Sequence, residues 1–145
     1  MNKKEIRKHH LNIRQEMPTI NLRDNSKLIN EGILNLISPF NSAESIGLFY
    51  PYNNEVDVLL MVSELEKRGL ACLLPKVIDK QLPLKYFFYS PDTSTLEKGY
   101  GGIMEPTGGE ERDPDIIITS CSAFNEKGYR VGYGGGFFDR TLNQL

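Results

Sequence analysis

The sequence contains no tryptophan, only two cysteines and no marked excess of charge of either sign. Because 17 lysines and arginines stand against 19 acidic residues, no overall positive field attracts a nucleic acid, and we expect no such partner. No apolar run approaches the roughly 20 residues of a membrane helix, and the charged N-terminus lacks the apolar stretch of a signal peptide. We therefore expect a soluble, cytoplasmic protein without a membrane partner.

The positions of the two cysteines argue against a redox pair and against a cysteine-bound metal. Cys72 and Cys121 form neither a CxxC pair nor a metal-binding set, and each lies in apolar, strand-like surroundings, so we expect free, buried thiols. The composition is that of an ordinary globular protein, with 39% hydrophobic residues, and 145 residues suit one domain with its own core. The charge is unevenly distributed, because positions 1–27 hold seven basic and three acidic residues. A positive patch of this size favours binding of a compact anion over binding of a charged polymer.

The N-terminal part of the chain has the period of α-helices. Apolar and semi-apolar side chains recur every three or four positions over residues 3–17, which predicts a helix that Pro18 ends. Asn21 is a suitable cap for a second helix that extends to Pro39. The expected buried face of that second helix consists of Leu22, Ile29, Ile33, Leu36 and Ile37.

The pattern then changes to short apolar runs that alternate with a helix. The expected strands are residues 45–50, 70–74, 84–89 and 115–119, with a helix over 56–68 and a glycine-rich loop over 90–111. A strand, a helix and a strand within about thirty residues form a βαβ unit, which favours a parallel sheet. The three consecutive isoleucines of the last strand predict burial on both faces. We therefore predict an α/β protein, a three-layer α/β/α sandwich with a mostly parallel sheet.

The segment 125–142 carries the strongest functional signal. Five glycines occur within nine positions and lead into an aromatic helix start, namely Gly128, Gly132, Gly134, Gly135 and Gly136. Glycine allows backbone amides to approach a ligand closely, and amides that converge near a helix N-terminus bind anions such as phosphate. The spacing matches neither a P-loop nor a dinucleotide fingerprint. A tight turn that binds no ligand remains the alternative from this segment alone.

Charged residues beside the glycines favour the ligand-binding interpretation. Arg130 and Arg140 flank the loop, and two guanidinium groups can bind the oxygens of a phosphate. Asp139 lies next to them, and a single carboxylate can bind Mg²⁺ that is otherwise held by water and phosphate. These residues predict a site for a phosphorylated ligand with a magnesium ion.

The run 130–140, RVGYGGGFFDR, resembles the signature R-[LV]-G-[YR]-G-x-G-[YF]-[YF]-D of the 5-formyltetrahydrofolate cyclo-ligases. Three further segments resemble this family in the same order. Residues 3–7 match K-x-x-[LI]-R, residues 50–57 are similar to its Y-x-P-x-x-x-E-V-x-T loop, and residues 102–106 match G-x-x-E-P. The resemblance covers nearly the whole chain, which is expected to form one cyclo-ligase-like domain over 1–145.

The resemblance implies a reaction in which ATP phosphorylates the formyl oxygen of 5-formyltetrahydrofolate. A folate nitrogen then attacks the activated carbon, and phosphate leaves to give 5,10-methenyltetrahydrofolate. Phosphoryl transfer requires mainly positioning and charge neutralisation from the protein. The small-molecule partner is thus a folate, and the implied cofactors are ATP and Mg²⁺.

The resemblance also assigns residues. Implied nucleotide contacts are Lys3, Lys4, Glu5, Ile6, Arg7, Arg130, Val131, Gly132, Tyr133, Gly134, Gly135, Gly136, Phe137 and Phe138. Implied folate contacts are Tyr50, Glu55, Tyr133, Gly134, Gly135, Gly136 and Phe137, and implied catalytic residues are Arg130, Tyr133 and Arg140, with Asp139 as the metal ligand. Simpler roles exist, because Lys3, Lys4 and Arg7 could form a solvated helix face, Tyr50 could be a core residue and Glu55 could cap the helix that follows it.

The chain departs from the family pattern in two places. Residues 119–125, TSCSAFN, replace a V-P-x-x-A-F-D run. Family members also continue past the position of Leu145 with further strands and a second acidic residue near the metal. We therefore expect a domain that lacks its last C-terminal strands, binds Mg²⁺ more weakly and can self-associate through an uncovered sheet edge. A remnant that only binds nucleotide or folate, or a relative acting on sugar phosphates or coenzyme A esters, are the alternative functions.

Overall fold

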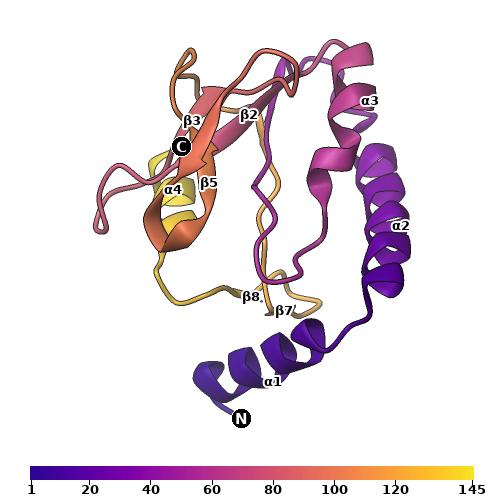
Figure 1. Ribbon diagram of the computed structural model, residues 1–145, viewed down its shortest axis with the longest axis vertical. Helices are drawn as coiled ribbons and strands as arrows, with labels where there is room; N and C mark the ends of the chain where they lie inside the picture. The colour runs from indigo at the N-terminus through magenta and orange to yellow at the C-terminus, as the bar shows by residue number, and fades with distance from the viewer.

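The computed structural model describes residues 1–145 and places helices on both faces of a four-stranded sheet. The sheet has the order β3-β2-β1-β6, with β1 (Ser45–Gly47), β2 (Ala71–Lys76), β3 (Lys85–Phe88) and β6 (Ile116–Ile117). Strand β1 pairs in parallel with both β2 and β6, and β3 pairs antiparallel with β2. Helices α2 (Thr19–Ile37) and α3 (Val62–Lys67) lie on one side of the sheet and α4 (Phe137–Gln144) on the other (Figure 1). The predicted α/β fold with a mostly parallel sheet is confirmed.

The core forms between β1, β2 and the connection that joins them. That connection consists of the 3-10 helix η1 (Val58–Met61) followed by α3, where sequence analysis predicted one helix over 56–68. Ile46, Leu48, Leu65 and Leu74 are fully buried because both sides of the central strands are covered. The parallel pairing of β1 and β2 across this connection confirms the βαβ unit.

Helix α2 differs from its prediction in both its start and its buried face. The helix begins at Thr19 after Pro18, so Asn21 lies in its first turn and is not the cap. Ile29 and Leu36 are 45% and 73% exposed, although the apolar pattern placed them in the core. The buried face holds Ile37, as predicted, together with the polar residues Ser26 and Asn30.

Hydrogen bonds explain why polar side chains occupy the buried face of α2. The Ser26 hydroxyl accepts from the amide of Asp57 at 3.0 Å, and the Asn30 amide group donates to the Asp57 carbonyl at 2.9 Å. Buried backbone groups at the start of η1 need such partners. The helix therefore turns toward η1 the polar side chains that satisfy these groups.

Two other predicted elements need correction. The 90–111 segment contains the hairpin of β4 (Leu96–Lys98) and β5 (Met104–Pro106), as well as the 3-10 helix η2 (Tyr100–Gly102). Strand β6 has two residues, lies at the edge of the sheet and pairs only with β1. Both of its residues are half-buried, so the predicted burial on both faces is wrong. The expectation of self-association through such an edge stays a prediction.

Further features concern the cysteines and the lengths of the helices. Both cysteines are free, as the sequence predicted. Cys72 is buried, as expected, whereas Cys121 is only half-buried. Burial, with a smaller contribution from the Glu66 carboxylate, raises the pKa of the Cys72 thiol to about 12. None of the helices combines the length and the apolar character that crossing a bilayer requires.

Candidate active site

A cavity of about 320 Å³ lies where the parallel strands β1, β2 and β6 end. Its walls come from Phe49 and Tyr50 after β1, Pro75 and Val77 at the end of β2, and Ser120 after β6. The rest of the wall consists of the loop between β8 (Arg130–Val131) and α4, together with part of α1 (Lys3–Gln15). The carboxyl ends of parallel strands are the usual location of ligand sites in open α/β sheets.

The glycine-rich loop follows a short hairpin, in which β7 (Ala123–Phe124) pairs antiparallel with β8. Gly134 and Gly136 have φ of 102° and 74°, values that strongly favour glycine. Gly136 is the N-cap of α4, and no side chain caps that helix. None of the amides of residues 132–136 donates a hydrogen bond to a backbone carbonyl. The loop therefore presents free amides to the cavity beside a helix N-terminus.

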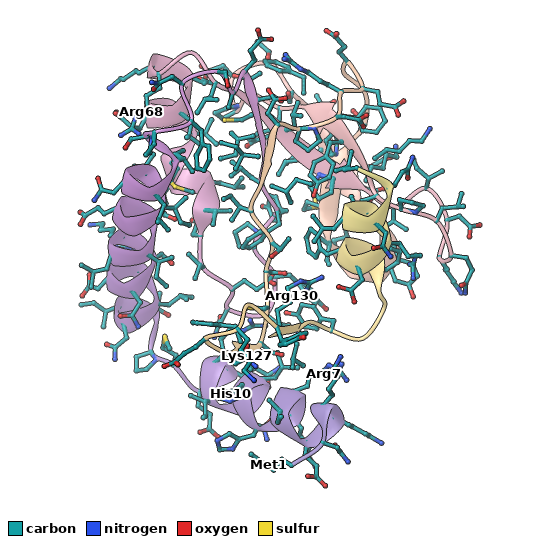
Figure 2. The ribbon with its side chains drawn as sticks, turned by 180° about the vertical axis from the view of Figure 1, so that it is seen from behind. Met1, Arg7, His10, Arg68, Lys127 and Arg130 are labelled. Carbon is teal, nitrogen blue, oxygen red and sulfur yellow. The ribbon has the colours of Figure 1, made fainter.

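Arg7 extends from α1 to this loop across 125 positions of sequence. Its Nε donates to the carbonyl of Gly132 at 2.5 Å, and a Cβ on Gly134 would lie 3.4 Å from its guanidinium carbon. In Figure 2 the labelled side chains of Arg7 and Arg130 lie on either side of the loop that leads into α4. Lys3, one turn earlier on α1, also lines the cavity. Two basic residues of the first helix thus line the same cavity as the glycine-rich loop.

Arg130 is held over the other side of the loop by three contacts. Its Nη2 donates to Asp139 at 2.9 Å, its Nη1 donates to the carbonyl of Ser120 at 3.4 Å, and its guanidinium carbon lies 5.3 Å from the centre of the Phe138 ring. Asp139 itself is exposed, with 77% of its side chain accessible. The arginine is therefore oriented by the protein, while the carboxylate remains accessible at the rim of the cavity.

Arg140 does not line the cavity, although the sequence placed it beside the loop. Its Nη1 and Nη2 donate to the carbonyls of Gly135 and Lys80 at 2.9 and 2.8 Å, and its guanidinium carbon lies 4.9 Å from the centre of the Phe137 ring. These contacts join the glycine-rich loop to the segment before β3. Arg140 thus supports the shape of the loop from outside.

Glu55 is a buried carboxylate of the site, with 5% of the residue exposed. Its Oε1 accepts from the amide of Tyr52 at 2.9 Å, and its Oε2 has no partner in the protein. Burial raises the pKa of this carboxyl, and Ser120, the Tyr52 amide and the charge of Arg14 partly oppose that rise. The helix that follows is capped by Asp57, which accepts from the Leu59 amide at 3.2 Å. Glu55 therefore has no capping role there and leaves one buried oxygen for a ligand.

Tyr50 and Tyr133 line the cavity as the sequence predicted, and the structure adds contacts that the sequence did not indicate. The Tyr133 hydroxyl accepts from Arg14 Nη2 at 2.6 Å, and its ring makes an edge contact with Tyr52 at 6.3 Å between centroids. Burial raises the pKa of the Tyr133 hydroxyl, with a further rise from the charge of Glu55. Arg14 was assigned no role by its sequence pattern.

The predicted site residues divide into those that line the cavity and those that do not. Those that line the cavity are Lys3, Arg7, Tyr50, Glu55, Arg130, Val131, Gly132, Tyr133, Gly134, Gly135, Gly136, Phe137, Phe138 and Asp139. Lys4, Glu5, Ile6 and Arg140 do not line it. Glu5 forms a capping box with Asn2 at the start of α1, with the Asn2 side chain accepting from the Glu5 amide at 2.9 Å. That helix cap explains its position in the motif.

The cavity wall also holds residues to which the sequence assigned no role, among them Tyr100 and Glu105. Tyr100 packs edge-on against Phe137 at 5.4 Å between ring centroids. Glu105, which is 8% exposed, accepts from the Val77 amide at 3.2 Å, and a Cβ on Gly99 would lie 2.1 Å from its carboxyl carbon. The G-x-x-E-P resemblance pointed to Glu105 without a role, and Gly99 was the local signal that a side chain lies against the backbone there.

The acidic residues of the site fit a magnesium ion only in combination with a ligand. No group of three or more His, Cys, Asp or Glu side chains is placed to hold a metal ion. Mg²⁺ in nucleotide sites usually relies on phosphate oxygens and one or two carboxylates. The exposed carboxylate of Asp139, at the cavity rim, fits that arrangement.

The fold and the cavity together define an α/β protein of the class whose ligands bind at the carboxyl ends of parallel strands, beside a glycine-rich loop. The chain belongs to the 5-formyltetrahydrofolate cyclo-ligase family, whose model matches residues 1–145. This is a family of ligases, as the names of its members state, so the chain is a member of an enzyme family.

Two solved structures and one curated protein illustrate the similarity. The NMR structure of the Aquifex aeolicus 5,10-methenyltetrahydrofolate synthetase has a TM-score of 0.81 and 32% identity, and covers 100% of this chain and 74% of that one. The corresponding Mycoplasma pneumoniae structure has a TM-score of 0.77 at 25% identity, over 100% and 79% of the two chains. The 5-formyltetrahydrofolate cyclo-ligase of Haemophilus influenzae is 29% identical over 97% of this chain and 77% of its own length.

Proposed function

We propose that this protein converts 5-formyltetrahydrofolate to 5,10-methenyltetrahydrofolate, using ATP and Mg²⁺, in the cytoplasm. Family membership supports the folate substrate and the ligase class. The cavity supports the cosubstrate, because one wall carries free amides and basic side chains and another carries a buried carboxylate. An anion and a hydrogen-bond donor can therefore be bound side by side in one site.

The observation that carries the proposal is the set of free amides at residues 132–136, next to an uncapped helix N-terminus. Each such amide needs an acceptor, and a helix N-terminus favours negative charge. Arg7 and Lys3 add positive charge on the same side. A triphosphate satisfies these groups together.

In the proposed reaction, the formyl oxygen attacks the γ-phosphorus of ATP, and ADP leaves. A second folate nitrogen then attacks the formyl carbon and loses its proton, and the former formyl oxygen departs with the phosphate. The amides of residues 132–136, Arg7 and Lys3 bind the phosphates, and Arg130 neutralises charge on the transferred group from across the loop. Arg140 acts only by supporting that loop.

The folate end of the site is assigned to Glu55 and the tyrosines. A pterin ring presents amino and amide N–H groups along one edge, and the unpartnered Oε2 of Glu55 is a buried acceptor for them. Tyr50 and Tyr133 supply aromatic faces for a flat ring. Asp139 would hold Mg²⁺, which would supply charge neutralisation for the nucleotide phosphates.

The proposal is tested by following the absorbance of the methenyl product. We expect product only when ATP, Mg²⁺ and 5-formyltetrahydrofolate are all present. Gly134→Ala should lower kcat/KM about tenfold, mainly through KM for ATP, because a side chain at φ 102° costs about 1–2 kcal/mol in loop conformation. Gly108→Ala is the matched control, because no atom lies within 4 Å of a Cβ there and its φ is not positive.

Two results would contradict the proposal. A folded, monodisperse sample that forms no product with all three components is not a catalyst of this reaction. Calorimetry then separates the remaining cases, since binding of ATP or folate without turnover identifies a binding protein and no binding of either excludes this ligand class.

A further inference from the structure

We infer that Arg14 is a positioning residue, which joins the two loops that carry Glu55 and Tyr133 and thereby sets the affinity of the site for the folate end of the substrate. The ligand named here rests on the proposed function. The geometry does not depend on it, because every contact that carries the inference lies within the protein.

Arg14 bonds to both loops at once. Its Nε donates to the carbonyl of Asn53 at 2.8 Å, and its Nη2 donates to the Tyr133 hydroxyl at 2.6 Å. Its guanidinium carbon also lies 5.7 Å from the centre of the Tyr133 ring. One half-buried side chain thus connects positions 53 and 133, which are 80 residues apart.

A comparison with Arg7 distinguishes positioning from ligand binding. The two arginines are seven residues apart on α1, so they lie on the same face, about 10.5 Å from each other along the axis. Arg7 lines the cavity and has one recorded hydrogen bond, whereas Arg14 does not line the cavity and uses its Nε and Nη2 on protein groups. Arg7 is therefore available to a ligand, and Arg14 acts through its neighbours.

The loop that Arg14 holds has an unusual backbone. Asn53 and Asn54 have φ of 50° and 58°, a conformation that non-glycine residues keep only when surrounding contacts enforce it. The Asn54 side chain adds bonds to the carbonyls of Arg14 and Gln15 at 3.0 and 3.4 Å. The end of α1 therefore fixes this turn from both its backbone and its side chain.

The turn that Arg14 holds ends at Glu55, which lines the cavity. A change in the position of this turn therefore changes the position of the Glu55 carboxylate. The Glu55 carboxylate accepts from the Tyr52 amide at 2.9 Å, and the Tyr133 hydroxyl donates to the Tyr52 carbonyl at 3.4 Å. Tyr52 thus contacts both residues that Arg14 positions. Loss of Arg14 releases the carboxylate and the aromatic wall together, while the contact of Arg7 with the glycine-rich loop remains.

The experiment compares Arg14→Met with Arg23→Met, a change at an exposed arginine of α2 without a recorded contact. In the free protein, amide hydrogen exchange of Tyr52, Glu55 and residues 129–131 should accelerate about tenfold in Arg14→Met, as expected for losing one charge-assisted hydrogen bond to each loop. Exchange of β2 should stay unchanged. Arg23→Met should behave as the unmodified protein throughout.

Kinetics supply the second readout. KM for 5-formyltetrahydrofolate should rise about tenfold in Arg14→Met, with KM for ATP changed less than about threefold. Tyr133→Phe removes only the hydroxyl, so its effect and that of Arg14→Met should combine to less than their sum in a double-mutant cycle. Arg14→Lys, which cannot make both bonds, should fall between.

Three outcomes would overturn the inference. These are unchanged exchange at Tyr52, Glu55 and residues 129–131 in Arg14→Met, equal acceleration of exchange in β2, and additive effects of Arg14→Met and Tyr133→Phe. Absence of turnover in the unmodified protein would refute the proposed function, and the exchange comparison would still decide whether Arg14 positions the two loops.

Discussion

The central strands and the first helix of this protein are held in place by different interactions. Strands β1 and β2 bury Ile46 and Leu74 completely, and their neighbours η1 and α3 bury Val58 and Leu65. Helix α1 has no buried residue and is joined to the loops around the cavity by the side chains of its two arginines. The core thus depends on area removed from water, and the binding face depends on a few polar bonds.

Because of this difference, substitutions in the core and substitutions around the cavity should change different properties. A substitution in the core acts on the free energy of unfolding, because packing there is dense on every side. A substitution at the arginines or the glycine-rich loop changes the position of groups that face a ligand and removes little buried surface. We therefore expect core variants to unfold and site variants to stay folded but bind poorly.

The largest effect is expected from Leu74→Ala in β2. Leu74 is 0% exposed, and removal of a fully buried leucine side chain usually lowers the free energy of unfolding by about 2–5 kcal/mol. Urea unfolding followed by circular dichroism measures this loss. Leu36→Ala is the control, because Leu36 is 73% exposed and should change stability by at most about 0.5 kcal/mol. Equal losses in the two variants would show that α2 buries its apolar side as its sequence pattern predicted.

The next effect is expected from Glu55→Gln, which keeps the shape of the side chain. At neutral pH, KM for the folate should rise about 10- to 100-fold, since a hydrogen bond to a charged group contributes about 1.5–3 kcal/mol. An unchanged KM would remove Glu55 from the folate site.

Glu55 should also make the stability of the unmodified protein depend on pH, and Glu55→Gln should remove that dependence. Burial raises the pKa of Glu55 in the folded protein above its ordinary 4.5, so the folded state holds this proton more tightly than the unfolded chain. The stability from this difference is complete below pH 4.5 and is lost as pH rises through the raised pKa. The free energy of unfolding of the glutamine variant should therefore lack this loss at rising pH. Parallel profiles of unfolding free energy against pH for the two proteins would contradict the prediction.

The smallest effect is expected from Asp115→Asn, at an exposed carboxylate that accepts from Ser45 at the start of β1. The pKa of the Asp115 carboxyl is lowered, chiefly by the amide of Glu44, which donates to it at 2.8 Å. The stabilisation is present above the ordinary value of 3.8 and is lost as pH falls through the lowered pKa. The variant should lack that acid-side loss in unfolding experiments, whereas Asp113→Asn, at an exposed carboxylate without a recorded bond, should retain it.

Local patterns were sufficient for much of the fold. Short apolar runs such as 70–74 indicated the central strands because a strand covered on both faces excludes polar side chains. The glycine-rich run 132–136 indicated the loop and its free amides, since few other residues adopt φ near 102°. Both signals belong to neighbouring residues, and neither needs a distant partner.

Other features depended on contacts between residues far apart in the chain. Ser26 and Asn30 are buried because they satisfy the backbone of Asp57, and no pattern within α2 contains that partner. Arg140 lies beside the loop in sequence but bonds away from the cavity, while Arg7, 125 positions from Gly132, bonds to the loop itself.

The amino-acid pattern alone indicated an α/β domain with a glycine-rich loop, because burial on two faces and glycine conformation are local properties. The folded chain decided which charged side chains face the cavity and which hold it in shape. A guanidinium group on a long side chain bonds to whichever acceptor folding brings within reach, and that acceptor is set by the packing of distant elements.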